Sequence, residues 1–474
     1  MITKNTLYHC IVLCLLCVPQ MAKSEIRLPA IFGDHMVLQQ QSDAPLWGTA
    51  LANKTVEVTT SWDNRTYFTN TDNTGKWRLK VHTPNAGGPY DITITDGAPF
   101  KLSDILIGEV WVCSGQSNMA MTFKGFINQP VLDANKTVAL SHNNSIRLFT
   151  VKRKASLNKL EELSGKWLQS NPENVSNFSA TAYHFGNMLQ EVLQVPVGLI
   201  CSSWGGTRIE PWISKDGLKE FNWVPEPEMD KEERVTHRIP TTLYNGMIHP
   251  LAGFGIKGVI WYQGESNKAE YKEYEKLLPG LINNWRAEWG IGDFPFYYAQ
   301  IAPYNYNVPG LNSALLREAQ LKASTAVENT GMISLMDIGE EKNIHPSNKQ
   351  VGGERFAYLA LAKAYGITGI VYSGPVLKEV KIEGPLVKLS FDHAVNGLTT
   401  FGKKLTNFKI AGKDKRFYPA HATINWQGIT LFSAFVPEPV AVRYAFDDFV
   451  VGELFNNAGL PASSFRTDDW EVYN

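Results

Sequence analysis

The chain has 474 residues, which exceeds what one ordinary hydrophobic core holds, so two or three domains are expected. Its hydrophobic fraction of 44% and charged fraction of 19% are ordinary for a folded globular protein. The formal net charge of −1 argues against nucleic acid as a partner, because nucleic-acid binding requires a basic surface.

Residues 1–23 have the features of a secretory signal peptide. Lys4 supplies positive charge, and residues 11–18 form an apolar run too short to span a bilayer. We therefore predict a secreted or periplasmic protein with no stable membrane insertion after cleavage; a retained membrane anchor is the alternative. Cys113 and Cys201 would remain in the mature chain, and we expect them to be unpaired core residues because both lie in predicted buried strands.

Residues 24–104 contain short strands separated by turns. Residues 55–59 alternate between apolar and polar side chains, and the Asp-Asn-Thr-Gly sequence at 72–75 is typical of a turn. This pattern predicts a small β-sandwich domain, in which we find no catalytic set of side chains. The predicted strands are residues 44–48, 55–59, 76–81 and 90–94.

Residues 105–370 change to alternating strands and helices, which is typical of a parallel sheet covered on both faces. Pro279 is expected to kink or interrupt the second of the predicted helices. The predicted strands are 105–113, 197–201, 258–262, 294–301 and 332–336, and the predicted helices are 180–194, 270–289, 313–327 and 352–365.

Residues 371–474 return to a β pattern and predict a second β-rich domain. The chain is therefore expected to be an α/β protein with β-rich domains at its amino and carboxyl ends. The predicted strands of this last part are 376–382, 386–391, 406–411, 423–426, 430–435 and 440–446.

One stretch of the α/β region, residues 105–119, joins a buried strand to a polar turn that contains Ser117. A serine directly beyond the carboxyl end of a buried strand lies where open α/β sheets bind their ligands. The sequence is not the G-x-S-x-G elbow of α/β-hydrolases, because Met119 occupies the second glycine position. A nucleophile and a plain polar turn both remain open on this stretch alone.

Three other predicted strands end in turns that carry chemistry. Gly205 and Gly206 follow one strand, and their N–H groups can serve as oxyanion donors. Gln263 follows another strand, and its amide can donate to an oxyanion. His345 follows a third and can act as a general base. Each residue has an ordinary structural explanation, but together with Ser117 they supply a nucleophile, donors and a base at one edge of a sheet.

These turns resemble the motif blocks of the SGNH (GDSL-like) hydrolases, and more closely those of the sialate O-acetylesterase and acetylxylan-esterase-like branch. The matching sequences are GQSNM, SWGGT, WYQGESN and IHPSNK, at 115–119, 203–207, 261–267 and 344–349. The resemblance implies a flavodoxin-like three-layer α/β/α core that removes acetyl groups from sugars. It implies Ser117 as nucleophile, His345 as base, and an oxyanion hole made by the N–H groups of Ser117 and Gly205 or Gly206 with the Gln263 side chain.

The sequence departs from that family at the acid that orients the histidine. An aspartate is often found two or three residues before the histidine, but Asn343 and Lys342 stand there. Glu341 is our predicted replacement. A backbone carbonyl in a serine–histidine dyad is an alternative, as is a weakened enzyme, because loss of the orienting acid can lower the rate on the order of 10⁴-fold.

The predicted substrate is an acetylated sugar or glycan, most directly an O-acetylated sialic acid, and the chemistry needs no metal or cofactor. Trp204 and Arg208 lie on a loop expected to border the site, and Arg208 either binds a sialic-acid carboxylate or pairs with Glu210 or Glu265. The alternatives are an esterase for acetylated polysaccharide such as xylan, and a catalytically silent glycan-binding protein. Activity should fall below the pKa of the histidine, which is roughly 6.5 if unperturbed.

Overall fold

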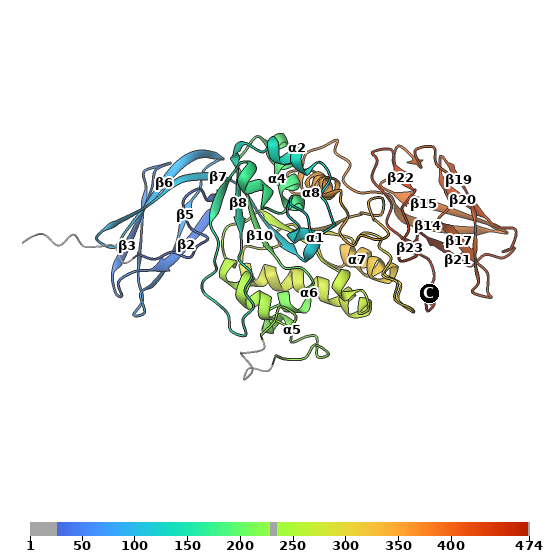
Figure 1. The fold of residues 1–474 in the computed structure, drawn as a ribbon, viewed down its shortest axis with the longest axis horizontal. Coiled ribbons are helices and arrows are strands. Elements are labelled where there is room, and N and C mark those ends of the chain that lie inside the picture. The colour runs from blue at the N-terminus through green and yellow to red at the C-terminus, as the bar shows by residue number, and fades with distance from the viewer. Residues whose placement is uncertain (1–25, 228–234, 473–474) are drawn as a thin grey trace, which may run out of the picture.

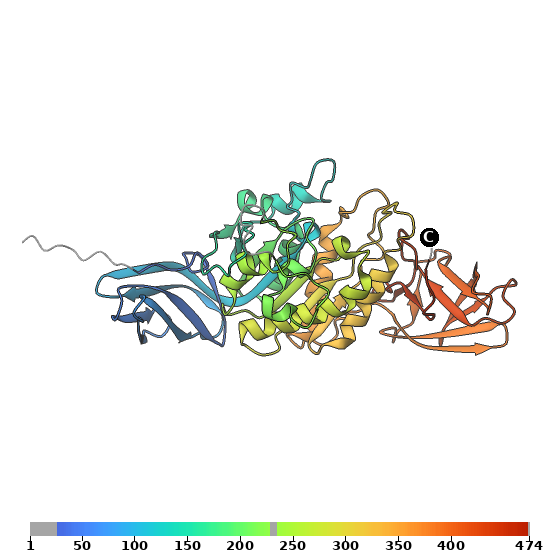
Figure 2. The same ribbon diagram turned by 90° about the horizontal axis from the view of Figure 1, so that it is seen from below.

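The computed structural model describes residues 26–227 and 235–472, and these form three parts that lie in a row along the long axis of the molecule (Figures 1 and 2). A β-rich part stands at each end, with an α/β part between them. The predicted signal peptide, residues 1–23, lies outside the described residues. Within those residues, no helix combines the length and the apolar character needed to cross a bilayer.

The amino-terminal part is built from short strands, as predicted; they pair antiparallel except for residues 37–39, which pair in parallel with residues 106–108. In β3 the side chains of Val56 and Val58 are buried while those of Thr55 and Glu57 are exposed, which is the alternation expected of a strand with one face in the core. The strands are β1 (Val37–Gln39), β2 (Asp43–Thr49), β3 (Thr55–Thr60), β4 (Thr66–Asn70), β5 (Lys76–His82) and β6 (Gly87–Thr95).

A single long strand, β7 (Pro99–Gly115), joins this part to the α/β part. Its first half pairs antiparallel with β6, and residues from Glu109 onward pair in parallel with strands of the central sheet. The predicted domain boundary after residue 104 therefore lies inside a continuous strand. The end of β7 that carries the Ser117 turn is buried throughout.

The central sheet has the order β13-β12-β11-β7-β10-β8-β9, and its strands run parallel except for β9 at the edge. β7 lies in the middle. The other members are β8 (Asn143–Thr150), β9 (Trp167–Ser170), β10 (Val197–Ser203), β11 (Gly258–Tyr262), β12 (Phe296–Ala299) and β13 (Thr330–Ile333). Because parallel strands point the same way, their carboxyl ends meet at one edge, and Ser117 lies at that edge.

Two separate hydrophobic cores cover the two faces of this sheet. Val110 and Val112 of β7 pack with α6 and α7, while Trp111 and Cys113 pack with α4 and α8, since successive strand residues point to opposite faces. Pro279 lies inside α6 without ending it. The long helices are α4 (Ala180–Leu193), α6 (Tyr271–Trp289), α7 (Ala314–Ala326) and α8 (Lys349–Lys363), and the short ones are α1 (Ser117–Ala120), α2 (Ala134–Ala139), α3 (Pro172–Ser176) and α5 (Lys215–Leu218).

The carboxyl-terminal part contains small antiparallel sheets around their own core. Buried Arg317 of α7 ties it to the central part, because its guanidinium donates to Ser464 Oγ at 3.1 Å and to the carbonyl of Asp448 at 3.3 Å. The strands are β14 (Val376–Glu383), β15 (Leu386–Asp392), β16 (Leu398–Thr399), β17 (Phe408–Ala411), β18 (Phe417–Pro419), β19 (His421–Asn425), β20 (Gly428–Phe432), β21 (Ala441–Tyr444), β22 (Phe455–Asn456) and β23 (Phe465–Arg466).

Candidate active site

Ser117 is positioned by the backbone at the end of β7. Gly115, with φ of +132°, lies so close to β11 that an added Cβ would stand 2.1 Å from the carbonyl oxygen of Tyr262. The next residue, Gln116, donates its N–H to that same oxygen at 2.9 Å. The chain then turns into α1, and Ser117, its first residue, is half-buried. Only glycine can make this turn, so the backbone itself places the hydroxyl.

The predicted glycine pair lies against Ser117. The N–H of Trp204 donates to the carbonyl of Gly115 at 3.0 Å, which holds the loop after β10 beside the nucleophile turn. A Cβ added to Gly205 would stand 3.2 Å from the Cβ of Ser117, whereas one added to Gly206 would meet nothing within 4 Å. Gly205 is therefore the glycine that contacts the nucleophile.

His345 is connected to the sheet edge that carries Ser117 through the preceding residue, Ile344. The side-chain amide of Asn118 donates to the carbonyl of Ile344 at 3.1 Å, so the residue after Ser117 is bonded to the residue before His345. Nδ1 of His345 lies 2.5 Å from Oε1 of Gln129. An amide oxygen only accepts, so Nδ1 carries the proton and Nε2 is the basic nitrogen of the ring.

The carboxylate predicted to orient His345 is not at that nitrogen. Glu341 is exposed, and Gln129 occupies the position at Nδ1 that was expected for it. Glu340 instead stabilises the loop, because its carboxylate accepts from the N–H of Ser347 at 2.6 Å and from the amide of Asn343 at 3.1 Å. Gln129 was missed because it lies in a long irregular stretch whose sequence carries no periodic pattern.

A buried polar network lies beneath the two loops. Lys349 Nζ donates to Asn118 Oδ1 at 2.5 Å, and Asn118 Nδ2 donates to Glu265 Oε1 at 2.5 Å. Lys349 and Glu265 are only 3% and 4% exposed. Lys349 and Glu265 together fix the orientation of the Asn118 side-chain amide. The second hydrogen of Asn118 Nδ2 is thereby directed to the carbonyl of Ile344. All three residues belong to the motif blocks, but the sequence did not indicate that they meet.

Burial sets the proton affinities of this site. It raises the pKa of Glu265, and it lowers the pKa of Lys349 to about 7 against the opposing charges of Glu265 and Glu340. Burial, and secondarily the positive charge of Lys349, lower the pKa of His345 to about 4. The imidazole is therefore neutral, and able to accept a proton, well below the pH near 6.5 expected for an unperturbed histidine.

Gln263 is fully buried, and both of its amide hydrogens are engaged. They are donated to the carbonyl of Thr207 at 3.1 Å and to Asn267 Oδ1 at 2.8 Å. Gln263 thus connects the β11 turn to the loop that carries the glycine pair. Donation to an oxyanion would require it to give up one of these bonds.

The two residues predicted to bind substrate, Trp204 and Arg208, have different partners. Arg208 pairs with Glu270 at 2.6 Å, and not with Glu210 or Glu265, the two partners considered from sequence. Trp204 is half-buried, and the imidazole of His237 stacks on it with ring centroids 4.9 Å apart.

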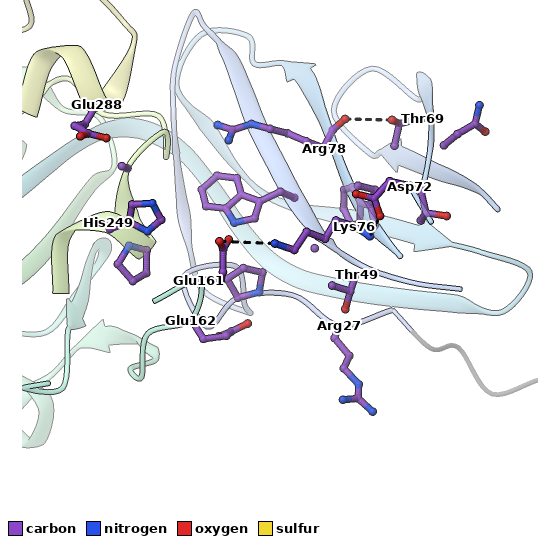
Figure 3. A pocket seen from close by; sticks show the side chains of 18 residues that line it. Arg27, Thr49, Thr69, Asp72, Lys76, Arg78, Glu161, Glu162, His249 and Glu288 are labelled. Atoms are coloured by element: carbon purple, nitrogen blue, oxygen red, sulfur yellow. Dashed lines mark hydrogen bonds and ion pairs between the residues drawn. The ribbon is translucent and has the colours of Figure 1, made fainter. Parts of the chain in front are cut away.

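A cavity of about 700 Å³ lies elsewhere, between the amino-terminal strands and the central part (Figure 3). Its wall includes Arg78, Lys76 and Glu161, the last two joined as an ion pair at 3.7 Å, and His249 faces them from the central part. Neither Ser117 nor His345 lines it. The catalytic candidates are therefore outside this cavity.

The chain is similar in sequence and in structure to known carbohydrate acetylesterases. A family described as carbohydrate esterase, sialic acid-specific acetylesterase, matches residues 107–361. The chain is 29% identical to the sialate O-acetylesterase of Mus musculus, with 94% of each chain covered, and 30% identical to that of Rattus norvegicus, with 89% of each covered. It also resembles the crystal structure of a carbohydrate acetylesterase from Xanthomonas citri, with a TM-score of 0.86, 35% identity and coverage of 94% of this chain and 100% of the other.

Proposed function

Because the chain belongs to the family of sialic acid-specific carbohydrate acetylesterases, we propose that it removes O-acetyl groups from sugars, and from sialic acids in particular, as a serine esterase. The observation that supports this most directly is the hydrogen bond of 3.1 Å from Asn118 Nδ2 to the carbonyl of Ile344. It joins the loop of Ser117 to the loop of His345. The alternatives are an esterase for acetylated polysaccharide such as xylan and a silent glycan-binding protein.

The strand order supports assignment of the core as a flavodoxin-like SGNH hydrolase. Counted from β7, the strands β10-β7-β11-β12-β13 follow the order 2-1-3-4-5 of flavodoxin-like sheets, with β8 and β9 as additions at one edge. We assign the core to residues 105–370, between β-rich domains at 24–104 and 371–474, with β7 shared by the first two. Secretion rests on the sequence of residues 1–23 alone.

In the proposed reaction, Nε2 of His345 accepts the proton of Ser117 while Oγ attacks the acetyl carbonyl. The N–H groups of Ser117 and Gly205 stabilise the tetrahedral oxyanion, with Gly206 and Gln263 as further candidate donors; loss of one such donor costs about 2.7–4 kcal/mol in other hydrolases. His345 then protonates the departing sugar alcohol. Water activated by the same imidazole cleaves the acetyl-enzyme and restores Ser117.

Gln129, the hydrogen-bond partner of His345 Nδ1, affects how strongly the imidazole can act as a base. Gln129 orients the ring as a carboxylate would, but it carries no charge to stabilise the imidazolium that forms during the reaction. The positive charge of Lys349 also destabilises the imidazolium form of His345. We infer a serine–histidine dyad with a weak base that stays unprotonated in acidic solution.

The test is acetate release from O-acetylated N-acetylneuraminic acids and from acetylated xylo-oligosaccharides, with Ser117→Ala as control. Release from the sialic acids, lost in the variant, supports the proposal. Release from the xylo-oligosaccharides alone would assign a polysaccharide esterase, and binding of either sugar without turnover would assign a glycan-binding protein.

A further inference from the structure

A run of three exposed basic residues, Lys152, Arg153 and Lys154, follows β8 at the edge of the sheet that carries Ser117. β8 runs parallel to β10, and the N–H of Val151 donates to the carbonyl of Cys201 at 2.9 Å. The basic run therefore leaves the sheet beside the turn that contains Trp204 and the glycine pair.

Arg153 is placed on the indole of Trp204. Its guanidinium carbon lies 5.9 Å from the centroid of the indole, on which His237 also stacks. The charge of Arg153, together with that of Arg238, adds to the effect of burial in lowering the pKa of His237. The ring contact places the guanidinium at this aromatic pair, and the contribution of Arg153 to the lowered pKa of His237 follows from that placement. Stacking on an indole restricts an arginine side chain and leaves the edge of its planar fork free to donate.

Arg208 is paired with a carboxylate, whereas Arg153 has no such partner in the described part of the chain. Glu270 neutralises Arg208 at 2.6 Å. Among residues 26–227 and 235–472, no carboxylate lies within ion-pair distance of Arg153. A guanidinium matches a carboxylate through two parallel hydrogen bonds, so a pre-oriented arginine that has no carboxylate partner in the described part of the chain fits an anionic group of a ligand.

We propose that Arg153, held on Trp204, binds the carboxylate of an acidic sugar whose acetyl ester lies at Ser117. The two positions are joined by one loop, because Gly205 follows Trp204 directly and a Cβ added to Gly205 would stand 3.2 Å from Ser117 Cβ. The proposal places one sugar across both positions, with its carboxylate at Arg153 and its acetyl ester at Ser117. This inference rests on the proposed esterase function and names the residue that would select acidic over neutral sugars.

The experiment compares 9-O-acetyl-N-acetylneuraminic acid with its C1 methyl ester, which is the same sugar without the negative charge. The measured quantity is the ratio of kcat/KM for the acid to that for the methyl ester, from acetate release. Arg153→Ala should lower this ratio roughly 10- to 100-fold, the range for a charge-assisted hydrogen bond to an ionised group. Arg153→Lys should give an intermediate ratio, because it keeps the charge without the fork.

The flanking residues supply matched controls. Lys152→Ala and Lys154→Ala remove one exposed positive charge each and should keep the wild-type ratio. An unchanged ratio in Arg153→Ala, or a loss of the ratio in Arg208→Ala instead, overturns the proposal.

A second measurement separates this proposal from the esterase function itself. Free N-acetylneuraminic acid should inhibit wild-type hydrolysis of 4-nitrophenyl acetate, and Arg153→Ala should raise its inhibition constant by the same factor of roughly 10 to 100. If the wild type cleaves 4-nitrophenyl acetate but the acid does not inhibit it, the Arg153 proposal fails while the esterase stands. If the wild type cleaves no ester, the esterase proposal fails, and binding of the acid to wild type and Arg153→Ala by calorimetry still tests Arg153.

Discussion

The nucleophile and the base of this site are held in different ways. Ser117 follows a buried strand whose turn is set by backbone contacts with Tyr262, so its position depends on glycine and main-chain geometry. His345 lies on a loop outside the sheet, and side chains hold it: Gln129 at its ring and Asn118 at the preceding carbonyl. Single substitutions away from the reacting atoms should therefore disturb the base more readily than the nucleophile.

Removal of the nucleophile should have the largest effect. Ser117→Ala should lower acetate release by at least about 10⁴-fold, because no other hydroxyl replaces Oγ in the acyl transfer. The melting temperature should stay near the wild-type value, since the backbone and not the hydroxyl makes the turn. Retention of more than a tenth of the activity in the folded variant would remove Ser117 from the mechanism.

Removal of the buried cation should have the next largest effect. Lys349→Met deprives Asn118 of its donor and should lower kcat roughly 100-fold through displacement of the two loops. It also removes the charge that helps to lower the pKa of His345 to about 4. The protonated imidazole cannot act as base, so wild-type activity should fall below about pH 4, and in Lys349→Met this decline should begin at higher pH, still below 6.5 because burial remains.

Lys342 is the matched control for that substitution, because it is an exposed lysine on the same loop as His345. Lys342→Met should leave both kcat and the acid limb of the profile unchanged. The profile of kcat/KM against pH with 4-nitrophenyl acetate measures both variants. An acid limb that stays near pH 4 in Lys349→Met would contradict electrostatic coupling between Lys349 and His345.

Gln129 and Glu341 can be compared directly as partners of His345. Gln129→Ala should lower kcat about 10-fold, since Nδ1 loses the acceptor that orients the ring, while Glu341→Ala should leave kcat near the wild-type value. Gln129→Glu should place a carboxylate at Nδ1, raise the pKa of His345 and move the acid limb to higher pH. A larger loss in Glu341→Ala than in Gln129→Ala would restore the acid predicted from sequence.

This contrast explains what the sequence alone can predict. Ser117, Gly205 and His345 follow predicted strands, and the rule that parallel strands end at one edge was enough to group them. Strand periodicity also located β10 and β11, although the predicted strand 332–336 is observed at Thr330–Ile333. Backbone-determined features of this kind leave a local pattern in the sequence.

The rest of the site depends on contacts between side chains that are distant in sequence. Gln129 lies 216 residues from His345, and Asn118 lies 231 residues from Lys349, so no local pattern reports either pair. The bonds that engage Gln263 are likewise set by tertiary packing. The unbroken course of β7 was also missed, because the strand changes partners midway and its residues change from partly exposed to fully buried.

The smallest effect is expected from the glycine pair, and it tests how rigidly the backbone holds Ser117. In Gly205→Ala the new methyl group would stand 3.2 Å from Ser117 Cβ, so one of the two must move by a few tenths of an ångström. We expect kcat to fall about three- to tenfold with little change in KM, because the shift affects the attacking atom more than the bound sugar. Gly206→Ala is the matched control: its methyl group meets nothing within 4 Å, but φ of +74° strains a non-glycine residue, so it should lower the melting temperature and spare kcat. If Gly205→Ala leaves kcat unchanged, the turn at Ser117 yields without loss of alignment, and the nucleophile is held no more firmly than the base.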